Sequence, residues 1–128
     1  MTATTKTVFA AALGMFALAA GAASASGERF TFSGVEYAPR AQRVPKAQAY
    51  VRRTMAPGVS MQVAIDAAQR AGARCDRPAA DGVVVCKESS MEKKPGEDLS
   101  DITWTVRLVP TADGRVADAS VTRSKAGF

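Results

Sequence analysis

Histidine is absent from this 128-residue chain, and its absence excludes more chemistry than any other feature of the composition. Histidine is the most common general base, the usual partner of a nucleophilic serine or cysteine, and the most common protein ligand of metal ions. The serines have no nucleophile-elbow sequence around them, and the sequence contains no glycine-rich phosphate loop. We therefore expect a protein that is not an enzyme and that binds no cofactor.

Carboxylates are also not arranged as a metal site would require. Their one cluster, Glu97, Asp98 and Asp101, lacks the alternating oxygen ligands and the closing glutamate of a calcium loop. The cluster falls in a polar stretch, residues 89–101, whose central Pro-Gly dipeptide predicts a mobile connection between two strands. We expect a solvated acidic loop there and no bound metal.

Cysteine is also scarce, and Cys75 and Cys86 are the only two cysteines. In an exported chain an isolated pair is typical of a disulfide. Asp81-Gly82 lies between them and predicts a hairpin turn, which would set the two cysteines opposite each other and within reach of a disulfide bond. The alternative is a redox-active pair, but such pairs usually have the Cys-x-x-Cys spacing at the start of a helix.

The prediction of export comes from the first residues of the chain. Lys6 precedes an apolar run over residues 8–20, and Ala23-Ser24-Ala25 fits the small-residue pattern that signal peptidase cuts. We expect residues 1–25 to be a cleaved signal peptide and the mature protein to be periplasmic or secreted. A retained anchor is the alternative, but a membrane span needs about 20 strongly apolar residues and this run is mostly alanine and glycine. No cysteine follows the small residues, so no lipid anchor is expected.

The part of the chain after the leader is predicted to be extended. Phe30 and Phe32 alternate with polar residues, which predicts a short half-buried strand over residues 28–37. Prolines 39 and 45 bracket a basic stretch, residues 40–44, which we expect to be a loop. Residues 26–44 are thus interpreted as an extended segment in front of an α+β domain that spans residues 45–128.

Two amphipathic helices are predicted at the start of that domain. The first begins at Pro45 and ends before Pro57, and its apolar face is formed by Ala47, Tyr50, Val51, Thr54 and Met55. The second helix covers residues 60–71. Ser60 suits its N-cap, and Gly72 suits a left-handed residue that ends the last turn.

After Gly72 the apolar residues recur with a period of two, which predicts strands. Strands are expected over residues 73–76, 83–88 and 115–123 and around the alternating residues Ile102, Trp104, Val106 and Leu108. Asp113-Gly114 predicts a tight turn before the last strand. The predicted fold class is α+β, with two helices packed on one face of a roughly four-stranded antiparallel β-meander and one disulfide.

This order of elements resembles a family of small periplasmic proteins. The string Pro57-Gly58-Val59-Ser60-Met61, the helix that ends at Gly72, and a meander that closes on Asp113-Gly114-Arg115-Val116 are similar to the SmpA/OmlA (BamE) outer-membrane assembly family. The resemblance covers residues 57–124 and implies a helix-plus-meander shape used for protein or envelope binding. Members of that family are lipoproteins with a cysteine at the cleavage site, which this sequence lacks, and no site residue is carried over.

Basic residues are the feature that points to a partner. The chain has a formal net charge of +5, and no acidic residue lies between Glu36 and Asp66. The basic residues in that interval are Arg40, Arg43, Lys46, Arg52 and Arg53. Such a field favours anionic surfaces, which in the envelope are lipid, lipopolysaccharide, wall polymer or an acidic protein, and nucleic acid is not expected there. The alternative is an ordinary solvated helix face.

These observations favour a non-enzymatic binding or assembly accessory of the bacterial cell envelope. A second interpretation is a secreted enzyme inhibitor that presents a rigid loop on its disulfide-bonded hairpin. The candidate inhibitor residues are Arg77, Pro78, Asp81 and Gly82. A hydrolase that uses carboxylates alone is a third interpretation.

The cleavage pattern generates a direct test. Because the small-residue site ends at Ala25, the exported protein is expected to begin at Ser26. Intact mass spectrometry of the protein recovered from the envelope or the medium measures this end. A mass that still includes the leader would contradict the prediction.

Overall fold

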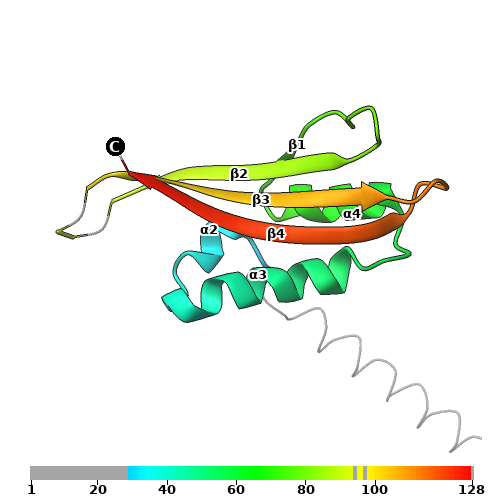
Figure 1. The fold of residues 1–128 in the computed structure, drawn as a ribbon. Helices are drawn as coiled ribbons and strands as arrows, with labels where there is room; N and C mark the ends of the chain where they lie inside the picture. Colours follow the sequence, from blue (N-terminus) through cyan, green and yellow to red (C-terminus); the bar gives the residue numbers. More distant parts are fainter. Residues whose placement is uncertain (1–28, 94, 97, 128) are drawn as a thin grey trace, which may run out of the picture.

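The structure is a computed structural model, and it describes residues 29–127 except positions 94 and 97. The predicted signal peptide and its cleavage site lie outside the described residues. The described chain forms three helices and four strands (Figure 1). The helices are α2 (Phe32–Val35), α3 (Arg40–Thr54) and α4 (Met61–Arg70), and the strands are β1 (Arg74–Cys75), β2 (Val84–Glu92), β3 (Ser100–Pro110) and β4 (Val116–Gly127).

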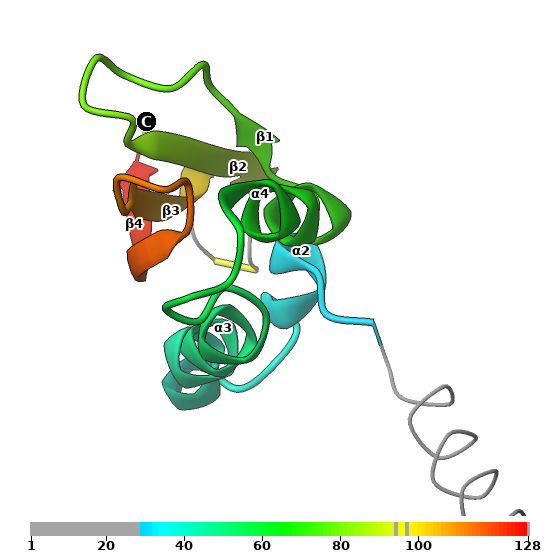
Figure 2. The same ribbon diagram turned by 90° about the vertical axis from the view of Figure 1, so that its right-hand side faces the viewer.

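The strands form one sheet in the order β1-β2-β3-β4, with every neighbouring pair antiparallel. This confirms the predicted α+β class and the meander. Figures 1 and 2 show the helices on one side of the sheet. Successive residues of a strand point to opposite faces, and one face of β3 is at most 1% exposed, through Ile102, Trp104, Val106 and Leu108. These residues form one hydrophobic core with the helices.

Helix α4 follows the sequence prediction closely. The hydroxyl of Ser60 accepts a hydrogen bond from the backbone N–H of Val63 at 3.1 Å, as expected of an N-cap. Gly72 has a φ of 100°, the left-handed conformation that ends the helix. The buried residues of α4 are Ala64, Ala67 and Ala68, and their small side chains let the helix approach the sheet closely.

The strand predicted over residues 28–37 is wrong, because this segment contains the short helix α2. The side chain of Thr31 caps α2 by accepting a hydrogen bond from the N–H of Gly34 at 2.9 Å. The alternating rings of Phe30 and Phe32 do face the core, but they pack on one another and on aromatic side chains instead of lining a sheet. Phe30 stacks on Tyr50 with 4.5 Å between ring centroids, and Phe32 lies 5.7 Å from Trp104.

The loop predicted over residues 40–44 is also wrong, because α3 already begins at Arg40 and contains Pro45. A proline in the second turn removes only the one N–H that would bond to the carbonyl of Ala41. The predicted apolar face is confirmed, since Ala47, Tyr50 and Val51 are buried. Burial of this face offsets the lost hydrogen bond, so the helix runs through the proline and the domain includes the segment interpreted as extended.

The stretch predicted as a mobile connection, residues 89–101, is strand at both of its ends. β2 continues to Glu92 and β3 begins at Ser100, which leaves residues 93–99 as the connection. The hydroxyls of Ser89 and Thr103 lie 3.2 Å apart across the two strands. The predicted connection is therefore too long, because the polar residues at both of its ends belong to the sheet.

The predicted disulfide is confirmed. Cys75 and Cys86 are bonded and occupy directly opposite positions on β1 and β2, with their Cα atoms 3.9 Å apart. β1 has only two residues, so backbone hydrogen bonds alone connect it weakly to the sheet. The covalent bond therefore supplies much of its attachment.

Replacing both cysteines with serine is expected to lower the free energy of unfolding by about 3 kcal/mol, because the unfolded chain regains the entropy of the opened loop. For a domain of this size, thermal unfolding should then shift down by roughly 10 °C or more. Circular dichroism during heating measures the shift. As a control, reductant should lower the Tm of the wild type and leave that of the variant unchanged. Labelling of native thiols by an alkylating reagent would contradict the assignment.

Candidate functional site

A hollow of about 480 Å³ lies between residues 29–38 and α3. Three basic side chains line it, from Arg29, Lys46 and Arg53, and its lining includes no carboxylate among the described residues. Its apolar lining comes from Phe30, Val35, Ala38 and Ala49. We call this hollow the cationic groove, and it combines positive charge with an apolar floor.

Aromatic packing holds the two walls of the cationic groove together. Phe30 stacks on Tyr50 of α3, and the hydroxyl of Tyr50 donates a hydrogen bond to the carbonyl of Ala67 in α4 at 2.8 Å. The guanidinium of Arg53 lies 5.7 Å from the centroid of the Tyr50 ring, within the range of a cation–π contact. The N-terminal segment is thereby packed against α3, and Arg53 is oriented by the same ring.

The structure separates the five basic residues that the sequence grouped together. Lys46 and Arg53 line the cationic groove, while Arg40 and Arg43 line a second hollow. Arg52 is exposed on α3 and lines neither hollow. The sequence analysis missed Arg29 as a groove residue. The signal for it was its position beside Phe30, whose ring packs against α3.

Arg43 is buried, with 8% of its surface exposed, so it does not belong to an open basic face. Its Nε donates to the carbonyl of Ala38 at 3.0 Å, and its Nη1 lies 3.6 Å from Oε1 of Glu36. Arg43 lies four positions before Ala47, so it continues the buried stripe of α3 by one turn. The predicted start of the helix at Pro45 concealed this periodicity.

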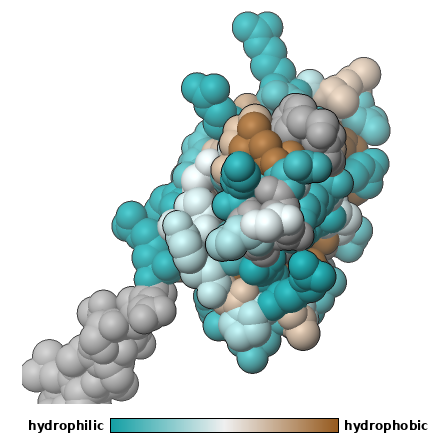
Figure 3. All heavy atoms as spheres, turned by 90° about the vertical axis from the view of Figure 1, so that its left-hand side faces the viewer, coloured by the Kyte–Doolittle hydropathy of each residue, from teal (hydrophilic) through white to brown (hydrophobic). Residues whose placement is uncertain are grey.

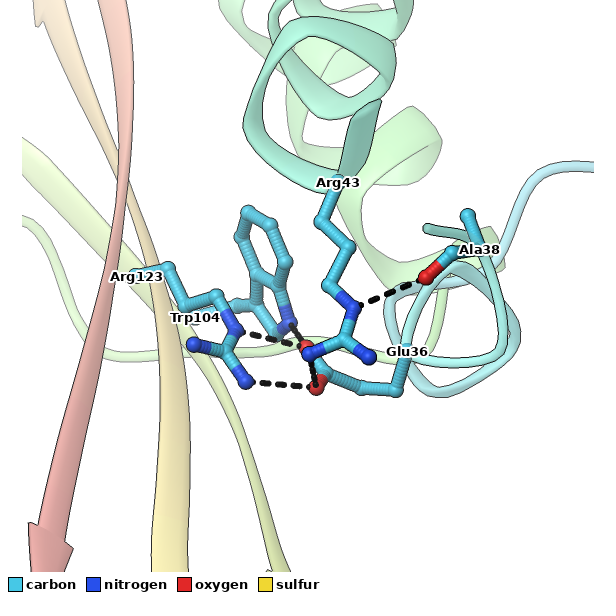
Figure 4. A network of polar contacts seen from close by, with 5 residues as sticks. All are labelled: Glu36, Ala38, Arg43, Trp104 and Arg123. Carbon is cyan, nitrogen blue, oxygen red and sulfur yellow. Dashed lines mark hydrogen bonds and ion pairs between the residues drawn. The ribbon is translucent and has the colours of Figure 1, made fainter. Parts of the chain in front are cut away.

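Glu36 is the centre of a buried polar network (Figure 4). Its Oε2 accepts hydrogen bonds from Nε1 of Trp104 and Nε of Arg123, both at 2.8 Å, and its Oε1 accepts one from Nη2 of Arg123 at 2.7 Å. The Glu36 side chain is 10% exposed. Burial alone would raise its pKa, but the hydrogen bonds from Arg123 and Trp104 and the charges of Arg123 and Arg43 outweigh burial and lower the pKa.

Glu88 is a second carboxylate in this region, and its pKa is shifted in the opposite direction to that of Glu36. It lies directly across from Trp104 in the sheet, and its Oε2 is buried without a hydrogen-bond partner. Burial, and then repulsion from Glu36, raise the pKa of Glu88. Two carboxylates with separated pKa values can mark an acid–base pair, but both oxygens of Glu36 are engaged by groups of its own chain. That engagement favours a structural role for Glu36.

The candidate inhibitor residues lie in the loop that joins β1 to β2. Figure 1 shows this loop projecting above the β1 edge of the sheet, away from α3. Arg77, Pro78 and Asp81 are exposed, and Gly82 is partly exposed. The loop is internally bonded, since the N–H of Val83 donates to the carboxylate of Asp81 at 3.1 Å and the N–H of Gly82 donates to the carbonyl of Ala79 at 2.8 Å.

The acidic cluster of the sequence is not assembled into a ligand set in the described residues. Asp98 is exposed in the connection, Asp101 belongs to β3, and Glu97 lies outside the described residues. No group of three or more Cys, Asp or Glu side chains in the described ranges could hold a metal ion. Among the helices that the structure describes, none is both long and apolar enough to cross a membrane.

Comparisons of the chain with models of protein families, with curated proteins and with solved structures returned no match. The resemblance of residues 57–124 to the SmpA/OmlA (BamE) family therefore stays a prediction.

Glu36→Gln and Glu88→Gln are expected to change stability in opposite directions at pH 7. Glu36→Gln removes the counter-charge of two partly buried arginines and should cost roughly 2 to 4 kcal/mol. Because the pKa of Glu36 is lowered in the folded protein, its stabilisation is present above the ordinary glutamate pKa and is lost as the pH falls through the folded value. The deficit of the variant should therefore shrink in acid.

Glu88→Gln should raise the thermal midpoint at pH 7. The pKa of Glu88 is raised in the folded protein, so its favourable contribution is present in acid and is lost as the pH rises through the folded value. Thermal unfolding of both variants and the wild type from pH 3 to pH 8 measures both effects. A Glu88→Gln protein that is less stable than the wild type at pH 7 would show that this carboxylate has a partner.

Proposed function

We propose that this protein is an exported, non-enzymatic binding or assembly accessory of the bacterial cell envelope, and that it holds an anionic envelope partner in the cationic groove. The observation that carries the proposal is the lining of that groove. Three cations converge on an apolar floor, and no carboxylate of the described lining neutralises them.

The chemistry of the groove fits a partner that carries both negative charge and apolar surface. The basic side chains attract anionic groups over about 8 Å at physiological salt, and the apolar floor gains free energy when it is covered. Anionic lipid, lipopolysaccharide, wall polymer and acidic envelope proteins all offer such groups. About half of the lining of the groove is apolar, so the groove favours an amphiphilic anion over a simple ion.

The disulfide and the predicted leader support the export in this proposal. A disulfide such as Cys75–Cys86 is typical of proteins in oxidising compartments, and the leader pattern of residues 1–25 points to the same destination. The absence of histidine from the sequence supports a non-enzymatic role. The resemblance to an outer-membrane assembly family agrees with this class of function.

A secreted enzyme inhibitor is the second candidate, and one observation favours it. The loop that carries Arg77, Pro78, Asp81 and Gly82 is exposed, internally hydrogen-bonded and closed by the disulfide. Such pre-organisation reduces the entropy lost on binding. Affinity capture from envelope and secreted fractions separates the two candidates, since a stoichiometric hydrolase would support the inhibitor and anionic envelope partners would support the groove.

Reversing the two α3 charges of the groove, with Lys46→Glu and Arg53→Glu together, is expected to weaken binding to anionic vesicles by about tenfold or more. The matched control is Arg52→Glu with Arg70→Glu, which reverses two exposed charges outside the groove. Co-sedimentation at low and physiological salt measures binding, and circular dichroism confirms folding. Equal losses in the two double variants would show that only net charge matters, and no binding by the wild type would overturn the proposal.

A further inference from the structure

One buried side-chain atom in the described residues has no hydrogen-bond partner, and it is Oε2 of Glu88. Buried polar groups in native proteins are almost always hydrogen-bonded, so each exception needs a physical explanation. The cost of such a position depends on protonation. An ionised carboxylate is strongly disfavoured there, whereas a protonated carboxyl group is neutral and is disfavoured much less.

Glu88 lies where the N-terminal segment, residues 29–38, meets the rest of the fold. A Cβ atom at Gly72, just after α4, would lie 4.0 Å from Cγ of Glu88. The preceding residue, Ala71, accepts a hydrogen bond from the N–H of Phe32 in α2 at 3.0 Å. Glu88 is therefore beside the joint that connects α2 to the end of α4.

Charged groups face Glu88 from some of the elements around it and not from others. They are Glu36 after α2, Arg40 and Arg43 on α3, Glu92 on β2, and Arg123 and Lys125 on β4. α4 packs through alanines, and β3 is apolar on this face, so neither adds a charge. Glu36 acts on Glu88 by repulsion. Arg123 bonds to Glu36, and no donor of the described chain reaches Oε2 of Glu88.

Ionisation of Glu88 is therefore unfavourable while the N-terminal segment is docked. Burial, and then repulsion from Glu36, raise the pKa of Glu88 above its ordinary value. If the segment moves away, water solvates the carboxylate and the pKa returns towards that of an exposed glutamate. By linkage, this carboxyl group favours the docked state in acid, and the advantage is lost as the pH rises through the raised pKa.

The N-terminal segment is suited to open locally. α2 is a single turn of four residues, and short elements at the edge of a fold open at low free-energy cost. A cleft of about 570 Å³ lies between α2 and the end of β2, and Ser90 lines it. Ser90 is the next residue after Glu88 on the same face of β2, so solvent is close. Figure 3 shows the end of the molecule that lies on the left of Figure 1, and most of its surface is hydrophilic.

We propose that Glu88 is a pH-sensitive switch for the N-terminal segment: the protonated carboxyl group lets residues 29–38 dock, and the ionised carboxylate loosens them. The chain contains no histidine, the side chain that ordinarily changes charge between pH 5 and 8, and a buried glutamate takes over that role. Arg29, Phe30 and Val35 of this segment line the cationic groove, so the switch also makes the groove dependent on pH. This coupling rests on the proposed function, whereas the switch itself does not.

Hydrogen exchange measured by NMR tests the switch. The reporters are the amides of Phe32, Val35 and Ala38, which are hydrogen-bonded in the docked segment. After correction for intrinsic exchange rates, their protection in the wild type should fall severalfold as the pH rises from 4.5 to 8. Low urea concentrations should change this protection little, because local opening exposes little surface. Amides of β3 should depend steeply on urea, because they exchange through global unfolding.

Glu88→Gln replaces the carboxylate by a neutral group of the same size, so it should keep these amides protected across the whole pH range. The matched control, Glu92→Gln, makes the same change on the same strand and should retain the fall of the wild type. Three results would overturn the proposal: constant protection in the wild type, an equal fall in Glu88→Gln, or opening of residues 29–38 with the free energy and urea dependence of β3. The last would mean that only global unfolding exposes Glu88.

Vesicle binding tests the coupling to the groove separately. Phosphatidylglycerol vesicles suit this test, because their phosphodiester keeps its charge over the range. Binding should weaken from pH 5 to pH 8 in the wild type and stay constant in Glu88→Gln. If exchange shows the switch and neither protein binds vesicles, the proposed function fails and the switch stands. If both proteins bind equally at both pH values, the groove is not coupled to the switch.

Discussion

A single buried carboxylate connects the parts of this domain that the hydrophobic core alone would leave loosely joined. Glu36 follows α2 directly, and it binds Trp104 on β3, Arg123 on β4 and Arg43 on α3. Removal of the carboxylate would leave two cations facing each other beside an indole. Unpaired buried charge is strongly destabilising, so the position of the N-terminal segment depends on this contact. Both hollows therefore also depend on this contact, because α2 lines one of them and the two arginines that bind Glu36 line the other.

The functional features lie where the hydrophobic core ends. Towards the middle of the sheet, aliphatic and aromatic residues meet the alanine-rich face of α4 and leave little space. Level with Trp104, the same sheet face carries Glu88 on β2 and Arg123 on β4. Charged side chains cannot be packed as closely as the core because they need partners or water. The hollow that Arg123 lines therefore lies where charged side chains flank the core.

The five basic residues that are neighbours in the sequence lie in three different environments in the structure. Lys46 and Arg53 line the cationic groove, Arg40 and Arg43 line the second hollow, beside β4, and Arg52 is an ordinary exposed residue. Their angular phase and their position along α3 separate them, and both depend on a helix that begins at Arg40 and runs through Pro45. The local rule that proline starts a helix was reasonable, but tertiary burial of the helix face outweighed it.

The amino-acid sequence by itself determined α4, the β-meander and the disulfide. Each follows from a local rule: the Ser60 cap and Gly72 bound the helix, a period of two marks the strands, and the Asp81-Gly82 turn places Cys75 opposite Cys86. Only the tertiary structure decided α2, the early start of α3 and the site residues. The reason is distance along the chain, because Glu36 meets Trp104 and Arg123 across separations of 68 and 87 residues. Contacts of that range leave no periodicity or spacing in the sequence, and they form only once the sheet and the helices have packed together.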